Sequence, residues 1–102
     1  VCAVGAVPVF VDVRRDTFNL DCDALEIMIE RVEKEGKLHP AVVLAVDLFG
    51  QPAEYDRIHE IARQHDMLVL EDGAQGFGGR IGEKKACSFG MLWGWWGSLY
   101  RQ

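Results

Sequence analysis

Two short apolar runs, each followed by carboxylates, constrain the fold of this chain most strongly. Residues 41–46 precede Asp47, and residues 67–70 precede Glu71 and Asp72. Runs this short and this apolar are typical of strands in a parallel sheet that is covered on both faces. Ligands of such sheets bind at the carboxyl ends of the strands, so we expect the polar groups that follow residue 70 to lie at a site. An ordinary strand that ends in a solvated Glu-Asp turn would give the same pattern.

Helical patterns flank the first of these runs. Asp21 is a good helix cap, and Gly36 is a good stop for the helix between them. Apolar residues repeat there at helical spacing: Leu25, Met28, Ile29 and Val32. A second helix is expected after residue 51, with Pro52 in its first turn. Its apolar stripe is Tyr55, Ile58, Ile61 and Ala62.

The β-branched and aromatic residues at 6–13 predict one further strand. The element order is then β-α-β-α-β with short links. Such an order predicts right-handed crossovers, a mostly parallel sheet and an α/β fold in which helices cover at least one face.

Length, charge and cysteine usage exclude several classes of protein. A chain of 102 residues has room for one domain or for part of a larger one. The net charge is −5 and the basic residues are scattered, which argues against a nucleic-acid surface. No apolar stretch reaches the ~18–20 residues that cross a bilayer, and no signal peptide is present, so a cytoplasmic location is expected. Three dispersed cysteines (Cys2, Cys22, Cys87) and three histidines give no support for a metal site or a disulfide framework.

The segment after residue 72 allows several kinds of site. Its glycines, from Gly73 to Gly82, could form a phosphate loop, but no helix is expected after them, so a turn-rich hairpin with solvated Lys84 and Lys85 is favoured. The strand at 68–72 also has the form of a Walker B strand, whose terminal carboxylate holds Mg²⁺. Alternatively, Asp72 could pair with a protonated pyridine nitrogen, which strengthens pyridoxal phosphate as an electron sink. Gln75 could then reach the same cofactor through its amide.

Three phrases of the chain carry a resemblance to a known family. They are VFVDVRRDTFNLDCDALE, AVVLAVDLFGQPAEYDRIHEIARQHDMLVLEDGAQGFGG and GEKKACSFG. In this order and at this spacing they resemble the DegT/DnrJ/EryC1/StrS family of pyridoxal-phosphate-dependent aminotransferases, over about residues 4–90. The resemblance implies a part of the large domain of the aspartate-aminotransferase-like fold (PLP fold type I), with a mostly parallel sheet.

The resemblance also implies roles for single residues. Asp72 matches the aspartate that pairs with the pyridine nitrogen, and Gln75 matches the glutamine beside the ring and its 3-hydroxyl. Residues 47–51 match a turn near the rim of the active site, to which no catalytic role is assigned. The implied substrates are a nucleotide-linked keto sugar and an amino-acid donor, typically glutamate, and the family works as a homodimer.

The chain departs from the family after Gly90. The phrase with the Schiff-base lysine is absent, Arg101 stands roughly in its place, and Lys84 and Lys85 come too early to replace it. A guanidinium is permanently protonated and cannot take the role of that lysine. We therefore expect residues 1–90 to be a partial large domain, inactive alone, and residues 91–102 to be an atypical Trp/Gly-rich tail. A truncated, non-catalytic module that associates with other subunits through its apolar surface is the alternative.

Overall fold

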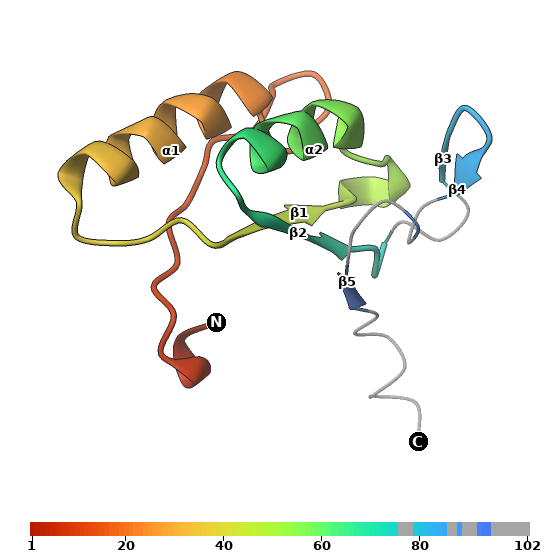
Figure 1. The fold of residues 1–102 in the computed structure, drawn as a ribbon. Coiled ribbons are helices and arrows are strands. Elements are labelled where there is room, and N and C mark those ends of the chain that lie inside the picture. Colours follow the sequence, from red (N-terminus) through yellow and green to blue (C-terminus); the bar gives the residue numbers. More distant parts are fainter. Residues whose placement is uncertain (76–78, 86–87, 89–91, 95–102) are drawn as a thin grey trace.

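The computed structural model describes residues 1–75, 79–85, 88 and 92–94. A two-layer α/β unit is formed in which two helices pack on one face of a small parallel sheet (Figure 1). The elements in chain order are η1 (Cys2–Val4), α1 (Cys22–Glu35), β1 (Val42–Val46), η2 (Leu48–Gly50), α2 (Tyr55–Gln64), β2 (Leu68–Asp72), β3 (Arg80–Ile81), β4 (Lys84–Lys85) and β5 (Leu92–Gly94).

Helix α1 has the ends that the sequence predicts. The Asp21 side chain accepts hydrogen bonds from the backbone N–H groups of Asp23 and Ala24, which have no partner within the helix. At the other end Gly36 adopts a left-handed conformation (φ 68°), and its N–H donates to the carbonyl of Val32. The two caps fix where α1 begins and ends.

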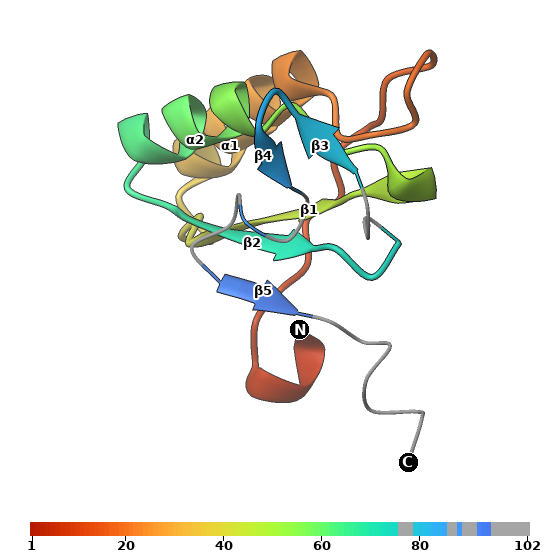
Figure 2. The same cartoon turned by 90° about the vertical axis from the view of Figure 1, so that its right-hand side faces the viewer.

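The sheet has the strand order β1-β2-β5, and both pairs are parallel. Ala45 is the partner of Glu71 across β1 and β2, and Val46 is the partner of Asp72. The strands therefore end side by side, and both deliver polar residues to the same edge (Figure 2). The antiparallel pair β3–β4 forms the hairpin expected in the glycine-rich segment, and Lys84 and Lys85 are exposed on it as predicted.

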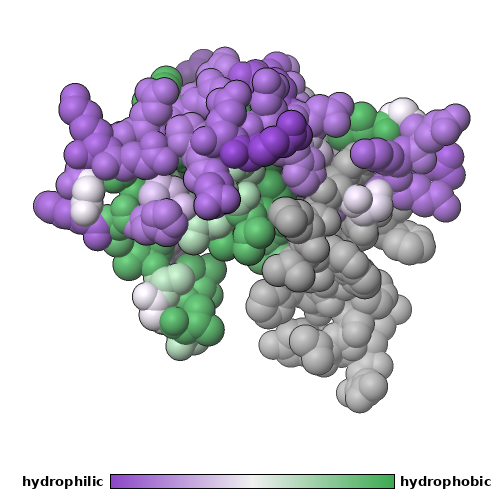
Figure 3. All heavy atoms as spheres, viewed as in Figure 1, coloured by the Kyte–Doolittle hydropathy of each residue, from purple (hydrophilic) through white to green (hydrophobic). Residues whose placement is uncertain are grey.

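The core lies between the helices and one face of the sheet. The predicted stripe of α2 is buried in full, and Leu25 and Ile29 of α1 pack with it. Alternate residues of β1 and β2 point into this core because side chains of a strand alternate between its faces. Hydrophilic side chains cover the helices on the outside (Figure 3).

The other face of the sheet carries exposed apolar side chains. Val42, Leu44 and Leu68 are each about half exposed there, among the residues that the structure describes. Both views place η1 on this side of the sheet, away from the helices (Figures 1 and 2). The sequence predicts cover on both faces of these strands, and the described residues cover one.

Three local predictions differ from the structure. The strand expected over residues 6–13 is wrong, because no described strand lies alongside this segment; Val13 forms an isolated bridge with Leu20. Helix α2 begins at Tyr55 rather than near Pro52, because hydrogen bonds to neighbouring side chains hold residues 52 and 53 in the preceding loop. Residues 92–94, for which no regular structure was expected, form β5.

Candidate functional site

Asp72 is the last residue of β2 and lies at the carboxyl edge of the sheet. Its side chain is half-buried, and its Oδ1 atom accepts a hydrogen bond from the backbone N–H of Ala74 at 3.1 Å. This local bond fixes the carboxylate relative to the turn that follows the strand. Asp72 alternates with buried Glu71, so its side chain belongs to the sheet face opposite the helices.

Gln75 lies three residues further along the same turn. Its Oε1 atom accepts a hydrogen bond from the backbone N–H of Phe49 at 3.0 Å, so the loop after β1 orients the amide. Phe49 has a positive φ of 56°, an uncommon conformation for an aromatic residue, and its ring packs edge-on against Phe18 with 6.1 Å between the ring centroids. The structure thus brings the two predicted cofactor residues, Asp72 and Gln75, to one edge of the sheet.

Gly50 allows the two loops to approach this closely. A Cβ atom built on Gly50 would meet the carbonyl oxygen of Gln75 at 3.0 Å, and the φ of Gly50 is +79°. Both the conformation and the contact favour glycine at this position.

Asp47 follows β1 and lies on the helix-covered side of the same edge. Its Oδ1 atom accepts hydrogen bonds from the Tyr55 hydroxyl at 2.7 Å and from the Ala53 N–H at 3.2 Å. Its backbone N–H donates to the carbonyl of Asp72 at 3.0 Å. Burial, opposed by the two hydrogen bonds, raises the pKa of the Asp47 carboxyl above its ordinary value, and the nearby Glu71 carboxyl raises it further.

The two successive carboxylates of β2 lie on opposite faces of the sheet and do not share one site. Glu71 is buried beneath the helices, whereas Asp72 is on the other face. The sequence alone could have separated Glu71 from Asp72. Side chains two residues apart in a strand point to the same face, so Glu71 shares a face with the apolar Val69.

Sequence reasoning also missed Asn19, which is buried and ties its own segment to the loop after β1. Its Nδ2 atom donates to the carbonyls of Gln51 and Pro52 at 2.9 and 3.2 Å, and its Oδ1 accepts from the Leu48 N–H at 3.2 Å. Asn19 therefore fixes the loop that carries Phe49. No local sequence pattern could have indicated this role, since its partners lie about 30 residues away along the chain.

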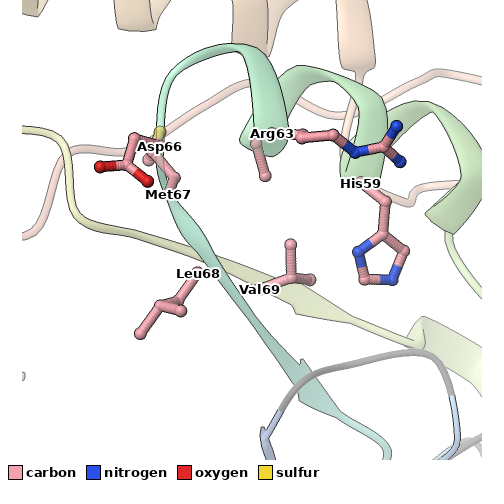
Figure 4. A pocket seen from close by; sticks show the side chains of 7 residues that line it. His59, Arg63, Asp66, Met67, Leu68 and Val69 are labelled. Carbon is pink, nitrogen blue, oxygen red and sulfur yellow. The ribbon is translucent and has the colours of Figure 1, made fainter.

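A cavity of about 390 Å³ lies elsewhere, between α2 and the start of β2 (Figure 4). Its lining includes His59, Arg63, Asp66 and Leu68. This cavity is at the amino end of β2, whereas Asp72 and Gln75 are beyond the carboxyl end. Ligands of open α/β sheets bind beyond the carboxyl ends of the strands. The candidate site is therefore the edge with Asp72 and Gln75, and not this cavity.

The structure also bears on the cysteines, on metal ligands and on membrane-spanning helices. Burial raises the pKa of the Cys22 thiol to about 11, so it is protonated at neutral pH. In the part of the chain that the structure describes, no three His, Cys, Asp or Glu side chains are placed to hold a metal ion, and no helix could span a membrane. Cys87 and Arg101 lie outside the described residues.

Comparison with known proteins gives the family. The model of the DegT/DnrJ/EryC1/StrS aminotransferase family matches residues 1–93. The chain belongs to this family. The family's cofactor is pyridoxal phosphate.

Individual relatives agree with this assignment. The UDP-2-acetamido-2-deoxy-3-oxo-D-glucuronate aminotransferase of Pseudomonas aeruginosa is 38% identical over 92 residues, which are 90% of this chain and 24% of that protein. A solved DegT/DnrJ/EryC1/StrS aminotransferase from Brucella abortus is similar with a TM-score of 0.86 and 43% identity, over 87% of this chain and 24% of that one. The GDP-4-keto-6-deoxy-D-mannose-3-dehydratase of E. coli, solved with bound hydrated PLP, has a TM-score of 0.66 and 30% identity, over 79% of this chain and 19% of that one.

These matches confirm the predicted fold class, the large domain of PLP fold type I with its mostly parallel sheet. The chain spans about a quarter or less of the length of the relatives it matches.

Proposed function

We propose that this chain forms part of the large domain of an aminotransferase that moves an amino group from an amino acid, typically glutamate, to a nucleotide-linked keto sugar. The paired placement of Asp72 and Gln75 at the carboxyl edge of the sheet carries the proposal. The names of the relatives support the substrate class, since the Pseudomonas aeruginosa protein is named for amination of an oxo sugar nucleotide. A homodimer in the cytoplasm is part of the same proposal.

The donor set at this edge fits pyridoxal phosphate. A carboxylate is the group that stabilises a protonated pyridine nitrogen, and an amide can hydrogen bond to a ring hydroxyl. Asp72 supplies the first group, held by the Ala74 N–H, and Gln75 supplies the second, held by the Phe49 N–H. When bound, the cofactor supplies an electron sink for the carbon from which the amine is transferred.

In this proposal the residues of this chain bind and orient, and they do not transfer the proton. With the cofactor bound, Asp72 would stabilise a proton on the ring nitrogen, and Gln75 would hydrogen bond to the ring hydroxyl. Lys84 and Lys85 are exposed on the β3–β4 hairpin. This hairpin forms a separate two-stranded sheet and does not pair with β2, the strand that carries Asp72. We therefore propose that the chain alone has no transaminase activity, because it lacks the family's Schiff-base lysine phrase.

A graft tests this function. Residues 1–90 of this chain replace the matching segment of the Brucella abortus aminotransferase, and the rest of that protein is kept unchanged. We expect the grafted enzyme to be active, and its Asp72→Ala variant to lose most of that activity. The control is Asp56→Ala, since Asp56 is an exposed carboxylate on α2. Equal turnover of the Asp72→Ala and Asp56→Ala grafts would refute the assignment, and glutamate-dependent turnover by the 102-residue chain alone would refute its inactivity.

A further inference from the structure

The helix-covered face of the sheet holds two carboxyl groups that the proposed reaction does not use. Asp47 and Glu71 are both 0% exposed. Ala45 is directly opposite Glu71 in the register, and Asp47 is two residues beyond Ala45, so the two carboxyl groups are diagonal neighbours on one face.

One oxygen of this pair lacks a partner. Asp47 Oδ1 has two donors, but Asp47 Oδ2 is buried and has no hydrogen-bond partner among the residues that the structure describes. A buried carboxylate oxygen without a donor is costly. The charge of the neighbouring Glu71 carboxyl raises the pKa of Asp47. Two carboxyl groups can hydrogen bond to each other only if one of them carries a proton.

We propose that Asp47 and Glu71 share one proton and form a buried carboxyl pair with a single negative charge. The shared proton gives Asp47 Oδ2 its missing hydrogen bond and removes the repulsion between two buried charges. The groups that face Asp47 are Glu71 from β2 and Tyr55 from α2, and the Tyr55 hydroxyl donates to the other oxygen.

The pair also makes Asp47 a positioning residue for Asp72 and Gln75, an extension that rests on the proposed function. The backbone N–H of Asp47 holds the carbonyl of Asp72. The Asp47 side chain closes the loop of residues 47–53 through the Ala53 N–H, and this loop presents the Phe49 N–H that orients Gln75. A change in the Asp47 carboxyl is thus transmitted to both predicted cofactor residues without contact with the cofactor.

Infrared difference spectroscopy of the 102-residue chain tests the shared proton directly. A protonated carboxyl has a carbonyl stretching band that carboxylates lack. At neutral pH we expect one such band in the unchanged chain, its loss in Asp47→Asn and in Glu71→Gln, and its retention in the control Asp56→Asn. Absence of the band from the unchanged chain, or its persistence in both pair variants, would overturn the proposal.

The pH dependence of stability gives a second measurement. The folded-state pKa of Asp47 is raised, so the folded state binds the proton more tightly than the unfolded state does. The stabilisation from this proton is therefore full below the unfolded pKa and is lost as pH rises through the folded pKa. The stability difference between the unchanged chain and Asp47→Asn should fall over that window, whereas a difference that is flat with pH would contradict the pair.

Amide hydrogen exchange tests the positioning role without any cofactor. In Asp47→Ala we expect exchange at Phe49 and Ala74 to be at least about tenfold faster, and in Asp47→Asn, which keeps the shape and can donate to Glu71, to change by less than about threefold. Ile58→Ala serves as the comparison, because Ile58 is a fully buried apolar residue that cannot hydrogen bond to the pair. If Ile58→Ala accelerates the same two amides as much as Asp47→Ala at equal loss of global stability, Asp47 has no positioning role. These readouts do not depend on pyridoxal phosphate, so they can fail while the proposed function holds.

Discussion

Removal of the Tyr55 hydroxyl should destabilise the chain by about 1–2 kcal/mol. Tyr55 is 1% exposed, so in Tyr55→Phe water cannot reach Asp47 to replace the lost donor. The hydroxyl bond is short, at 2.7 Å, and loss of a partner for a buried group costs about 1–3 kcal/mol. We place the effect in the lower part of that range because Asp47 Oδ1 keeps the Ala53 N–H at 3.2 Å. The phenyl ring stays, so no cavity term is added.

Urea unfolding, followed by circular dichroism, measures this loss. A change of 1–2 kcal/mol lowers the midpoint by about 1 M at the urea dependence of ~1–3 kcal/mol/M that small proteins show. In a double-mutant cycle with Asp47→Asn, the double variant should lose less stability than the sum of the two single losses, because the two residues are in direct contact. A midpoint shift below about 0.2 M in Tyr55→Phe, at an unchanged slope, or strict additivity with Asp47→Asn, would refute the reasoning.

Three further substitutions test the fold and the site. Asp21→Ala should lower stability by about 1 kcal/mol in urea unfolding, since it removes the α1 cap; no change would contradict the capping geometry. Ile58→Ala should cost about 2–5 kcal/mol because the side chain is fully buried, whereas exposed Ile27→Ala should change stability by less than about 0.5 kcal/mol; similar losses would contradict the packing of the helices. Gly50→Ala should separate the two loops and raise the hydrogen-exchange rate at Phe49, because its Cβ would meet the Gln75 carbonyl oxygen at 3.0 Å; an unchanged rate would contradict that approach.

The sequence predicts those features that depend on neighbours along the chain. Asp21 and Gly36 mark the ends of α1 because capping is a contact over a few residues. The buried stripe of α2 follows from helical periodicity alone. The nearness of Asp72 and Gln75 also depends on chain neighbours, since Gln75 lies in the turn directly after β2, which ends at Asp72.

Features that depend on distant partners could not be predicted. A β-rich pattern at residues 6–13 indicates a preference for extended backbone, but a strand also needs a neighbour, and no described strand supplies one. Asn19 is buried because it satisfies backbone groups of the loop after β1. Asp47 and Glu71 are diagonal neighbours because β1 and β2 pair in a particular register, which the composition of neither strand reveals.

The affinity of the site for pyridoxamine 5′-phosphate tests the central claim most directly. This amine form of the cofactor binds without a covalent bond to lysine, so its affinity reports on the residues that hold the ring. In the grafted enzyme we predict that Asp72→Ala raises the Kd about 10-fold to 150-fold, the equivalent of one hydrogen bond to a charged group, and that Asp56→Ala leaves it unchanged. Equal Kd values for the unchanged graft and Asp72→Ala would contradict the claim that this edge of the sheet holds the cofactor.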